Sequence, residues 1–344
     1  MRKLPQFAEI ARVLEQRSQF LLVCHERADG DALGSLLGLG LPLRSLGKSA
    51  IMYSPGGVPE AYSFLPHAQE IIPSLEAGSH QEVEVVVCLD CDGLARAGAL
   101  SQWLDDGSNP ADRNEGDKKQ DLMGRRPLLI DIDHHEPEKG FGEIRLITPK
   151  AAATALLVYA ILKEMRVRIS KEVATCLLTG LYLDTGSLRY ENTDAEVFRV
   201  AGELTALGAE PSFVARGLYD TKSLPALQLL GRALCSASTA SGGKIVFALL
   251  TPQDFQEAGA EREEIEGIID LLRANRDATV AALFIQHDSA EVKVSLRSRG
   301  KVDVAAIASR YGGGGHARAA GFTLPGRLGE VIPTIIDEIQ RSLP

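Results

Sequence analysis

Carboxylates and imidazoles recur in four short stretches of this sequence. In chain order they are His25 with Asp29 and Asp31, then Asp90, then Asp133-His134-His135, and finally Asp184. A single aspartate at such a place is most often a helix cap or a loop residue. Four converging stretches are different, because clustered carboxylates raise one another's pKa unless a cation neutralises them. Together they predict a metal site.

The donor types favour some metals over others. Oxygen and imidazole donors without an evident thiolate suit Mn²⁺ best, whereas Mg²⁺ fits imidazole less well, and Zn²⁺ or Co²⁺ could substitute. Four or more carboxylates exceed what one ion uses, so we expect two ions in the site. Pairs of divalent ions about 3.5–4 Å apart are a common device for hydrolysing phosphate esters. The residues therefore predict a two-metal phosphohydrolase.

Apolar runs of strand length precede three of the four stretches. They cover 20–24, 83–89 and 128–132, and a fourth run covers 50–53. Near-continuous apolar runs are typical of parallel strands that are buried on both faces. Apolar residues spaced at three and four predict helices, and these lie at 31–46, 151–165 and 171–183. In such a sheet, ligands bind beyond the carboxyl ends of the strands, which is where the acids and histidines lie.

The 344 residues are more than one ordinary core serves, so two domains are expected. We predict an α/β fold with an N-terminal, doubly wound parallel-sheet domain over 1–194 and a helical connector over 195–240. A smaller C-terminal α/β domain with a mixed sheet is expected over 241–344, and the active site in the cleft between the domains. The charged stretch 105–126 has almost nothing to bury, so it is expected to be a solvated loop.

The second domain is expected to alternate strands and helices. Strand-like runs with β-branched residues cover 244–250, 279–286 and 291–296. The last two are separated by a short polar turn and so predict a hairpin. Helical patterns at 263–273, 302–310 and 328–343 would cover the sheet.

Charge and composition limit the classes of binding partner that the protein can have. A net charge of −9 repels long polyanions, so long duplex nucleic acid is not an expected partner. The longest apolar stretch, 36–43, falls short of the roughly 20 residues that a membrane span needs, and the first residues lack a secretory signal. Five cysteines, an odd number, favour reduced thiols. We expect a cytoplasmic protein with no membrane partner. Its oligomeric state is left open, a homodimer included.

The order of these motifs resembles the DHH phosphoesterase superfamily. H-x-x-x-D-x-D at 25–31, the strand-end Asp90, the Asp133-His134-His135 triplet and the L-D-T-G that contains Asp184 match its four motifs. The segment GGGHARAAG at 313–321 matches its associated substrate-binding domain. Length and arrangement resemble the nano-RNase (oligoribonuclease) and pAp-phosphatase branch, where pAp is 3′-phosphoadenosine-5′-phosphate. The resemblance covers nearly the whole chain and implies action on short single-stranded oligoribonucleotides, with release of mononucleotides, and on pAp.

Roles for the metal-site residues follow from this resemblance. It implies that one ion is held by His25 and Asp29, the other by Asp31, His134 and Asp184, with Asp90 bridging the two. His135 would point at the phosphate or the leaving oxygen, the alternative being a supporting hydrogen bond. Asp133 is expected to orient a histidine rather than bind metal.

The resemblance also implies a substrate-binding set in the second domain. Its members are Arg297, Arg299, Gly313, Gly314, Gly315 and His316. A run of glycines lets the backbone approach an anion closely, although a plain glycine turn is the alternative. Arginine forks bind phosphate through two parallel hydrogen bonds, so this domain should hold one phosphate while the metals act on another bond.

Two other functions stay open at this point. One, within the same class, is a phosphodiesterase of linear dinucleotides such as pApA from cyclic-dinucleotide turnover. The other is a non-catalytic nucleotide-binding module, which has no need for so many mutually repelling carboxylates.

Overall fold

The computed structural model describes residues 4–75, 82–105, 127–135, 141–265, 267–286 and 291–343. The chain divides into two compact units, Met1–Thr221 and Lys222–Pro344. The division falls inside the expected connector at 195–240, and the predicted domain limits and the expected cleft stay predictions. The stretch 106–126 and the expected hairpin turn at 287–290 lie outside the described residues. No helix in the described part of the chain is long and apolar enough to cross a bilayer.

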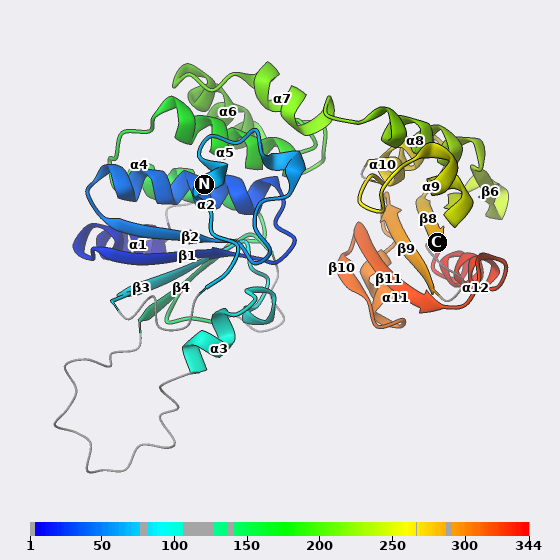
Figure 1. Ribbon diagram of the computed structural model, residues 1–344, viewed down its shortest axis with the longest axis horizontal. Coiled ribbons are helices and arrows are strands. Elements are labelled where there is room, and N and C mark those ends of the chain that lie inside the picture. The colour runs from blue at the N-terminus through cyan, green and yellow to red at the C-terminus, as the bar shows by residue number, and fades with distance from the viewer. Residues whose placement is uncertain are drawn as a thin grey trace, which may run out of the picture. The chain divides into compact units, whose positions relative to one another are not determined.

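The first unit is built on a five-stranded sheet (Figure 1). Its strands are β1 (Gln19–Cys24), β2 (Ser49–Tyr53), β3 (Val85–Leu89), β4 (Leu128–Asp133) and β5 (Ile144–Ile147). All neighbours pair in parallel in the order β2-β1-β3-β4-β5, so the predicted parallel sheet is confirmed. The chain runs from β1 to β2 on one side of β1 and then returns to β3 on the other side. This reversal is the place where open α/β sheets bind ligands.

Helices and apolar side chains cover both faces of this sheet. The helices of this unit are α1 (Pro5–Gln16), α2 (Gly30–Ser45), α3 (Leu100–Asp105), α4 (Thr154–Glu164), α5 (Lys171–Asp184), α6 (Ala195–Ala206) and α7 (Pro211–Tyr219). Phe20 and Leu22 belong to one core with residues of α1, α2 and α4, whereas Leu21 and Val23 belong to another with Leu100 of α3. The alternation along β1 therefore buries both faces of the strand, as its continuous apolar run predicts.

The second unit holds a six-stranded sheet in the order β10-β11-β9-β8-β7-β6. Its strands are β6 (Ser238–Ala240), β7 (Ile245–Leu250), β8 (Val280–Gln286), β9 (Glu291–Ser298), β10 (Gly314–His316) and β11 (Ala319–Pro325). Only β7 and β8 pair in parallel, so the predicted mixed sheet is confirmed. The strands β6, β10 and β11 were not predicted, because the first is very short and the other two are rich in glycine and alanine.

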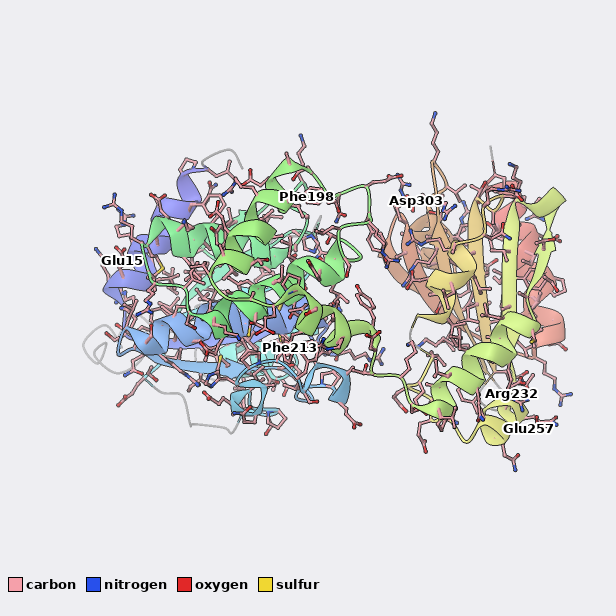
Figure 2. All side chains as sticks on the ribbon, turned by 90° about the horizontal axis from the view of Figure 1, so that it is seen from above. Glu15, Phe198, Phe213, Arg232, Glu257 and Asp303 are labelled. Carbon is pink, nitrogen blue, oxygen red and sulfur yellow. The ribbon has the colours of Figure 1, made fainter. Side chains whose placement is uncertain are left out.

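Helices cover both faces of the second sheet as well. They are α8 (Leu224–Cys235), α9 (Pro252–Ala258), α10 (Ile268–Arg273), α11 (Val304–Ser309) and α12 (Leu328–Arg341). Arg232 of α8 forms a 2.6 Å ion pair with Glu257 of α9 (Figure 2). The helix expected over 263–273 was too long, because α10 begins only after Gly267, which has a φ of 83°. The left-handed conformation of this glycine cannot continue a helix.

Candidate active site

The first motif lies where β1 ends and α2 begins. Asp29 is the N-cap of α2, and its Oδ1 accepts hydrogen bonds from the backbone N of Asp31 (2.9 Å) and of Ala32 (3.1 Å). Asp31 follows in the first turn and is completely buried. A strand, a turn and a capped helix start thus bring the residues of H-x-x-x-D-x-D together.

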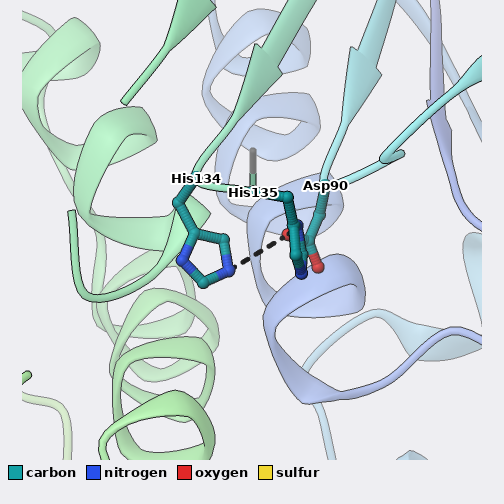
Figure 3. A group of neighbouring side chains, drawn as sticks. All are labelled: Asp90, His134 and His135. Carbon is teal, nitrogen blue, oxygen red and sulfur yellow. Dashed lines mark ion pairs between the residues drawn. The ribbon is translucent and has the colours of Figure 1, made fainter. Parts of the chain in front are cut away.

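Asp90 follows β3 directly and occupies a central position. Its φ is 62°, a left-handed conformation that is uncommon for residues other than glycine and that often occurs at functional sites. Its Oδ2 lies 3.7 Å from Nε2 of His25. Its Oδ1 lies 3.6 Å from Nε2 of His134 and 3.4 Å from Nδ1 of His135 (Figure 3). Oδ2 therefore faces one histidine, and Oδ1 faces the two histidines of the triplet.

His25 and His134 share one hydrogen-bond pattern. Nδ1 of His25 lies 2.7 Å from the carbonyl of Glu26, and Nδ1 of His134 lies 3.3 Å from the carbonyl of Ala151. A ring that donates from Nδ1 to a carbonyl carries the lone pair on Nε2, which is the arrangement usual for a metal-binding histidine. Both Nε2 atoms face carboxylates, so the rings are oriented as ligands.

Asp184 and the second histidine of the triplet complete the cluster. Asp184 is the last residue of α5, and its Oδ2 lies 3.0 Å from Nε2 of His134. His135 is held differently, since its Nδ1 lies 2.7 Å from Oδ1 of Asp133. The other oxygen of Asp133 accepts a 2.7 Å hydrogen bond from the backbone N of Asp92. Asp133 thus orients His135, in agreement with the role expected for it.

The donor atoms form three overlapping groups, each with its atoms within 4.8 Å of one another. The groups are His25, Asp29 and Asp90; Asp31, His134 and Asp184; and Asp90, His134 and His135. All six residues predicted as ligands are therefore brought together, and Asp90 belongs to two of the groups. Oxygen and imidazole donors that cluster in this way fit divalent cations such as Mn²⁺.

The electrostatics of the cluster also fit a cation. Burial, followed by the charge of Asp184, raises the pKa of Asp29 and raises that of Asp31 strongly. Burial and the charge of Asp29 raise the pKa of Asp90 in the same way. Burial would lower the pKa of His134, but its hydrogen bond to Asp184 and the surrounding carboxylates raise it to about 11. The cluster holds more carboxylates than its histidines can neutralise, and bound divalent ions would neutralise the remaining negative charge.

Two residues that contact the cluster had not been predicted from the sequence. The side-chain oxygen of Thr154 donates a 2.9 Å hydrogen bond to Asp90, and its backbone N donates a 2.6 Å bond to Asp31. Nη2 of Arg96 lies 3.1 Å from Nδ1 of His25. The available signal for Thr154 was its place at the start of a helical pattern, where backbone N–H groups bind anions. Arg96 gave none, because it lies in a short turn segment.

In the second unit, several residues predicted to bind substrate lie on neighbouring strands of the sheet. Arg297 of β9 pairs with Ala319 of β11, which in turn pairs with His316 of β10. Directly opposed residues of antiparallel strands share a face, so Arg297 and Ala319 lie on one face of the sheet. Nε of Arg297 lies 3.7 Å from Oδ1 of Asp270. Arg299 lies beyond the end of β9 and hydrogen-bonds instead, through Nη1, to the carbonyl of Asn275 (3.3 Å).

The glycines of the motif serve different purposes. A Cβ on Gly313 would lie 2.4 Å from Cβ of Phe322, and one on Gly315 would lie 2.4 Å from the carbonyl O of Ala319. These two glycines are therefore explained by the close packing of β10 on β11. A Cβ on Gly314 would meet nothing within 4 Å, so its missing side chain leaves open space. A ligand can approach the backbone closely at Gly314.

Comparison with known proteins identifies the family. The models of the DHH family N-terminal domain and of the DHHA1 domain match residues 19–181 and 241–343. The bifunctional oligoribonuclease and PAP phosphatase NrnA of Thermus thermophilus is 32% identical and aligns over 99% of this chain and 94% of its own. The chain belongs to the DHH family. This DHH protein is thus an enzyme, a hydrolytic phosphoesterase.

Solved structures support the fold of this DHH phosphoesterase. An exopolyphosphatase-related protein of Bacteroides fragilis superposes with a TM-score of 0.85 at 24% identity, covering 98% of this chain and 96% of its own. The RecJ of Thermus thermophilus in complex with Mn²⁺ superposes with a TM-score of 0.55 at 16% identity, covering 99% of this chain and 55% of its own. These likenesses concern the fold alone.

Proposed function

We propose that this DHH protein is a manganese-dependent phosphohydrolase that degrades short oligoribonucleotides to mononucleotides and removes a phosphate from pAp. The observation that carries the proposal is the position of Asp90, whose two oxygens face separate histidine and carboxylate groups. A shared carboxylate between two donor groups is what a two-ion phosphoesterase needs. The relative from Thermus thermophilus, named for both activities, supports the substrate class.

In this proposal His25 and Asp29 would hold one ion, Asp31, His134 and Asp184 would hold the other, and Asp90 would be available to both. Bound divalent ions lower the pKa of water and offset the charge that develops on phosphate oxygens. The protein contributes orientation, because helix starts fix Asp29 and Asp31 and backbone carbonyls fix the rings of His25 and His134. Such fixed donors need no rearrangement when the reaction occurs.

His135 is proposed to assist the leaving group. Its Nδ1 is engaged by Asp133, so the ring presents Nε2 as the atom that donates a proton. The oxygen of a water molecule forms a new bond to phosphorus as the phosphorus–oxygen ester bond breaks, and the leaving oxygen takes the proton from Nε2. The attacking water releases a proton to solvent, and the ring recovers one from solvent. Asp133 faces the ring as a carboxylate, since burial would raise the pKa of this carboxyl but its hydrogen bond and charge pairing with His135 lower it.

The second unit is proposed to hold a phosphate away from the bond that is cut. Arg297 and Gly314 carry this role best, the first as a cation on β9 and the second as a backbone position open to a ligand. Arg299, Gly313, Gly315 and His316 remain part of the proposed set. For Gly313 and Gly315, strand packing is already a sufficient reason for the missing side chain.

Product analysis by chromatography tests the function. The panel is pAp, a diribonucleotide, a five-residue oligoribonucleotide, pApA and pyrophosphate, each with Mn²⁺. We expect mononucleotides from the oligoribonucleotides and AMP with phosphate from pAp. Turnover of pApA alone would favour the dinucleotide phosphodiesterase. Binding of these nucleotides without any product would contradict the proposal and favour a binding module.

A further inference from the structure

Thr154 donates hydrogen bonds to two carboxylates of the proposed metal site, those of Asp90 and Asp31. It is the first residue of α4 and is completely buried. Its hydroxyl donates to Oδ1 of Asp90 at 2.9 Å, and its backbone N donates to Oδ2 of Asp31 at 2.6 Å. We propose that Thr154 is a positioning residue that fixes the orientation of Asp90 and thereby the spacing of two bound cations. This inference rests on the proposed metal-dependent function.

The carboxylate of Asp90 needs a fixed rotation to serve both donor groups. Its Oδ2 faces His25 and its Oδ1 faces His134, at 3.7 and 3.6 Å from their Nε2 atoms. Turning the carboxylate about its bond would move both oxygens away from the groups that they face. The hydroxyl of Thr154 meets Oδ1, the oxygen on the side of His134. A donor on that oxygen therefore holds the side of the site that contains Asp31, His134 and Asp184.

Threonine suits this position because its side chain has few rotamers. Two heavy atoms on Cβ restrict χ1, so the hydroxyl is directed before any ion binds. The N-cap of α4 is Ala153, and Thr154 is not the cap residue. Its hydroxyl bond therefore reaches across the site, from the start of α4 to the end of β3. The Thr154 hydroxyl thus bonds the Asp90 carboxylate and does not cap α4.

The backbone of the same helix turn fixes the second carboxylate. Thr154 and Ala155 donate N–H groups to the two oxygens of Asp31, at 2.6 and 2.9 Å. The positive end of the helix dipole stabilises a negative charge there. One turn of α4 thus sets Asp31 through its backbone and Asp90 through a side chain. Replacing the side chain alone separates the two effects, because the backbone bonds remain.

The experiment compares Thr154→Val with Thr154→Ser in the full-length protein. Valine keeps the shape and removes the hydroxyl, whereas serine keeps the hydroxyl. Thr175→Val is the matched control, because Thr175 is also buried but its hydroxyl donates to the helix carbonyl of Lys171 at 2.8 Å. Titration calorimetry measures Mn²⁺ affinity and the number of ions bound. Electron paramagnetic resonance reports the magnetic coupling of two neighbouring Mn²⁺ ions.

We expect Thr154→Val to weaken one of two Mn²⁺ ions by about 10–100-fold, the range usual for partners of metal ligands. The coupled resonance signal should weaken with it, whereas Thr154→Ser and Thr175→Val should resemble the wild type. Two ions bound to Thr154→Val with wild-type affinity and coupling would overturn the inference. So would an equal loss in Thr154→Ser.

Two further outcomes keep the test decisive. If Thr154→Val does not fold, Thr154→Ala removes the same hydroxyl with less bulk and is measured in its place, with the same expected loss. A wild-type protein that binds no Mn²⁺ would overturn the metal-dependent function itself. Normal Mn²⁺ binding and activity in both wild type and Thr154→Val would overturn only the role of Thr154.

Discussion

Asp131 offers a quantitative test of how this fold carries buried charge. It lies on β4 with only 1% of its surface exposed, between Cys88 of β3 and Arg145 of β5 in register. Its Oδ1 has no hydrogen-bond partner in the described part of the chain. Burial, followed by the charge of Asp133, raises the pKa of Asp131 from 3.8 to about 7. Asp131→Asn removes the charge and keeps the shape.

The size and sign of the effect follow from the two pKa values. In the unfolded chain the carboxyl ionises near 3.8, and in the fold only near 7, so the folded state binds the extra proton between these values. The wild type therefore loses stability as the pH rises from about 4 to about 7. At about 1.36 kcal/mol for each tenfold change in ionisation, the cost relative to a neutral side chain is about 1.7 kcal/mol at pH 5 and about 4 kcal/mol at pH 8.

Urea unfolding at pH 5 and pH 8 in the presence of a chelator measures this difference. The advantage of Asp131→Asn over the wild type should grow by about 2.5 kcal/mol between the two pH values and stay nearly constant above pH 8. Glu9→Gln is the control, since it removes one carboxylate from an exposed position on α1. A difference between Asp131→Asn and the wild type that does not vary with pH would refute the reasoning. The carboxylate would then act as a hydrogen-bond acceptor that the fold needs.

Three further predictions concern activity. Asp90→Ala should lower kcat by several orders of magnitude, whereas Cys91→Ser should change kcat little, because the Cys91 thiol donates to backbone carbonyls and belongs to none of the three metal-donor groups. Steady-state kinetics on pAp compares the two variants, and equal losses would contradict the proposed role of Asp90. Gly314→Ala should fold and raise KM for pAp, whereas Gly313→Ala should lower the melting temperature, because the added Cβ would collide with β11. Thermal unfolding and KM distinguish the two variants, and an unchanged KM in Gly314→Ala would exclude close approach of the substrate to this glycine. Arg297→Ala should raise KM for pAp and a diribonucleotide more than for a small aryl phosphate ester, and equal losses on all three would point to a structural role.

The sequence predicted the strands β1, β2, β3 and β4 of the first unit well because each is an apolar run of strand length. It did not predict β5, whose four residues include an exposed arginine, or β10 and β11, whose small residues resemble a turn. In both cases pairing with a neighbouring strand, rather than local composition, forms the element. Periodicity placed α2 and α5 within two residues of their observed ends.

The acids and histidines of the site could be found in the sequence because three of their four stretches follow buried strands, and the fourth, with Asp184, ends a helix. Their supporting contacts could not, since Thr154 reaches Asp90 across 64 positions of the chain and Arg96 reaches His25 across 71. Which oxygen of a carboxylate faces which histidine depends on such long-range contacts. A motif therefore specifies the donors, and the fold specifies their orientation.

Two helix starts explain how this fold holds clustered acids before any cation binds. Asp29 caps α2, and Asp31 accepts two backbone N–H groups from the start of α4. Each helix start offers partial positive charge, which lowers the cost of a nearby carboxylate by about 0.3–1 kcal/mol. That is less than a shift of one pKa unit costs, and burial still raises the pKa of both acids. The helix starts therefore set the geometry of the site, while burial still opposes the ionisation of its carboxylates, which bound divalent cations would favour.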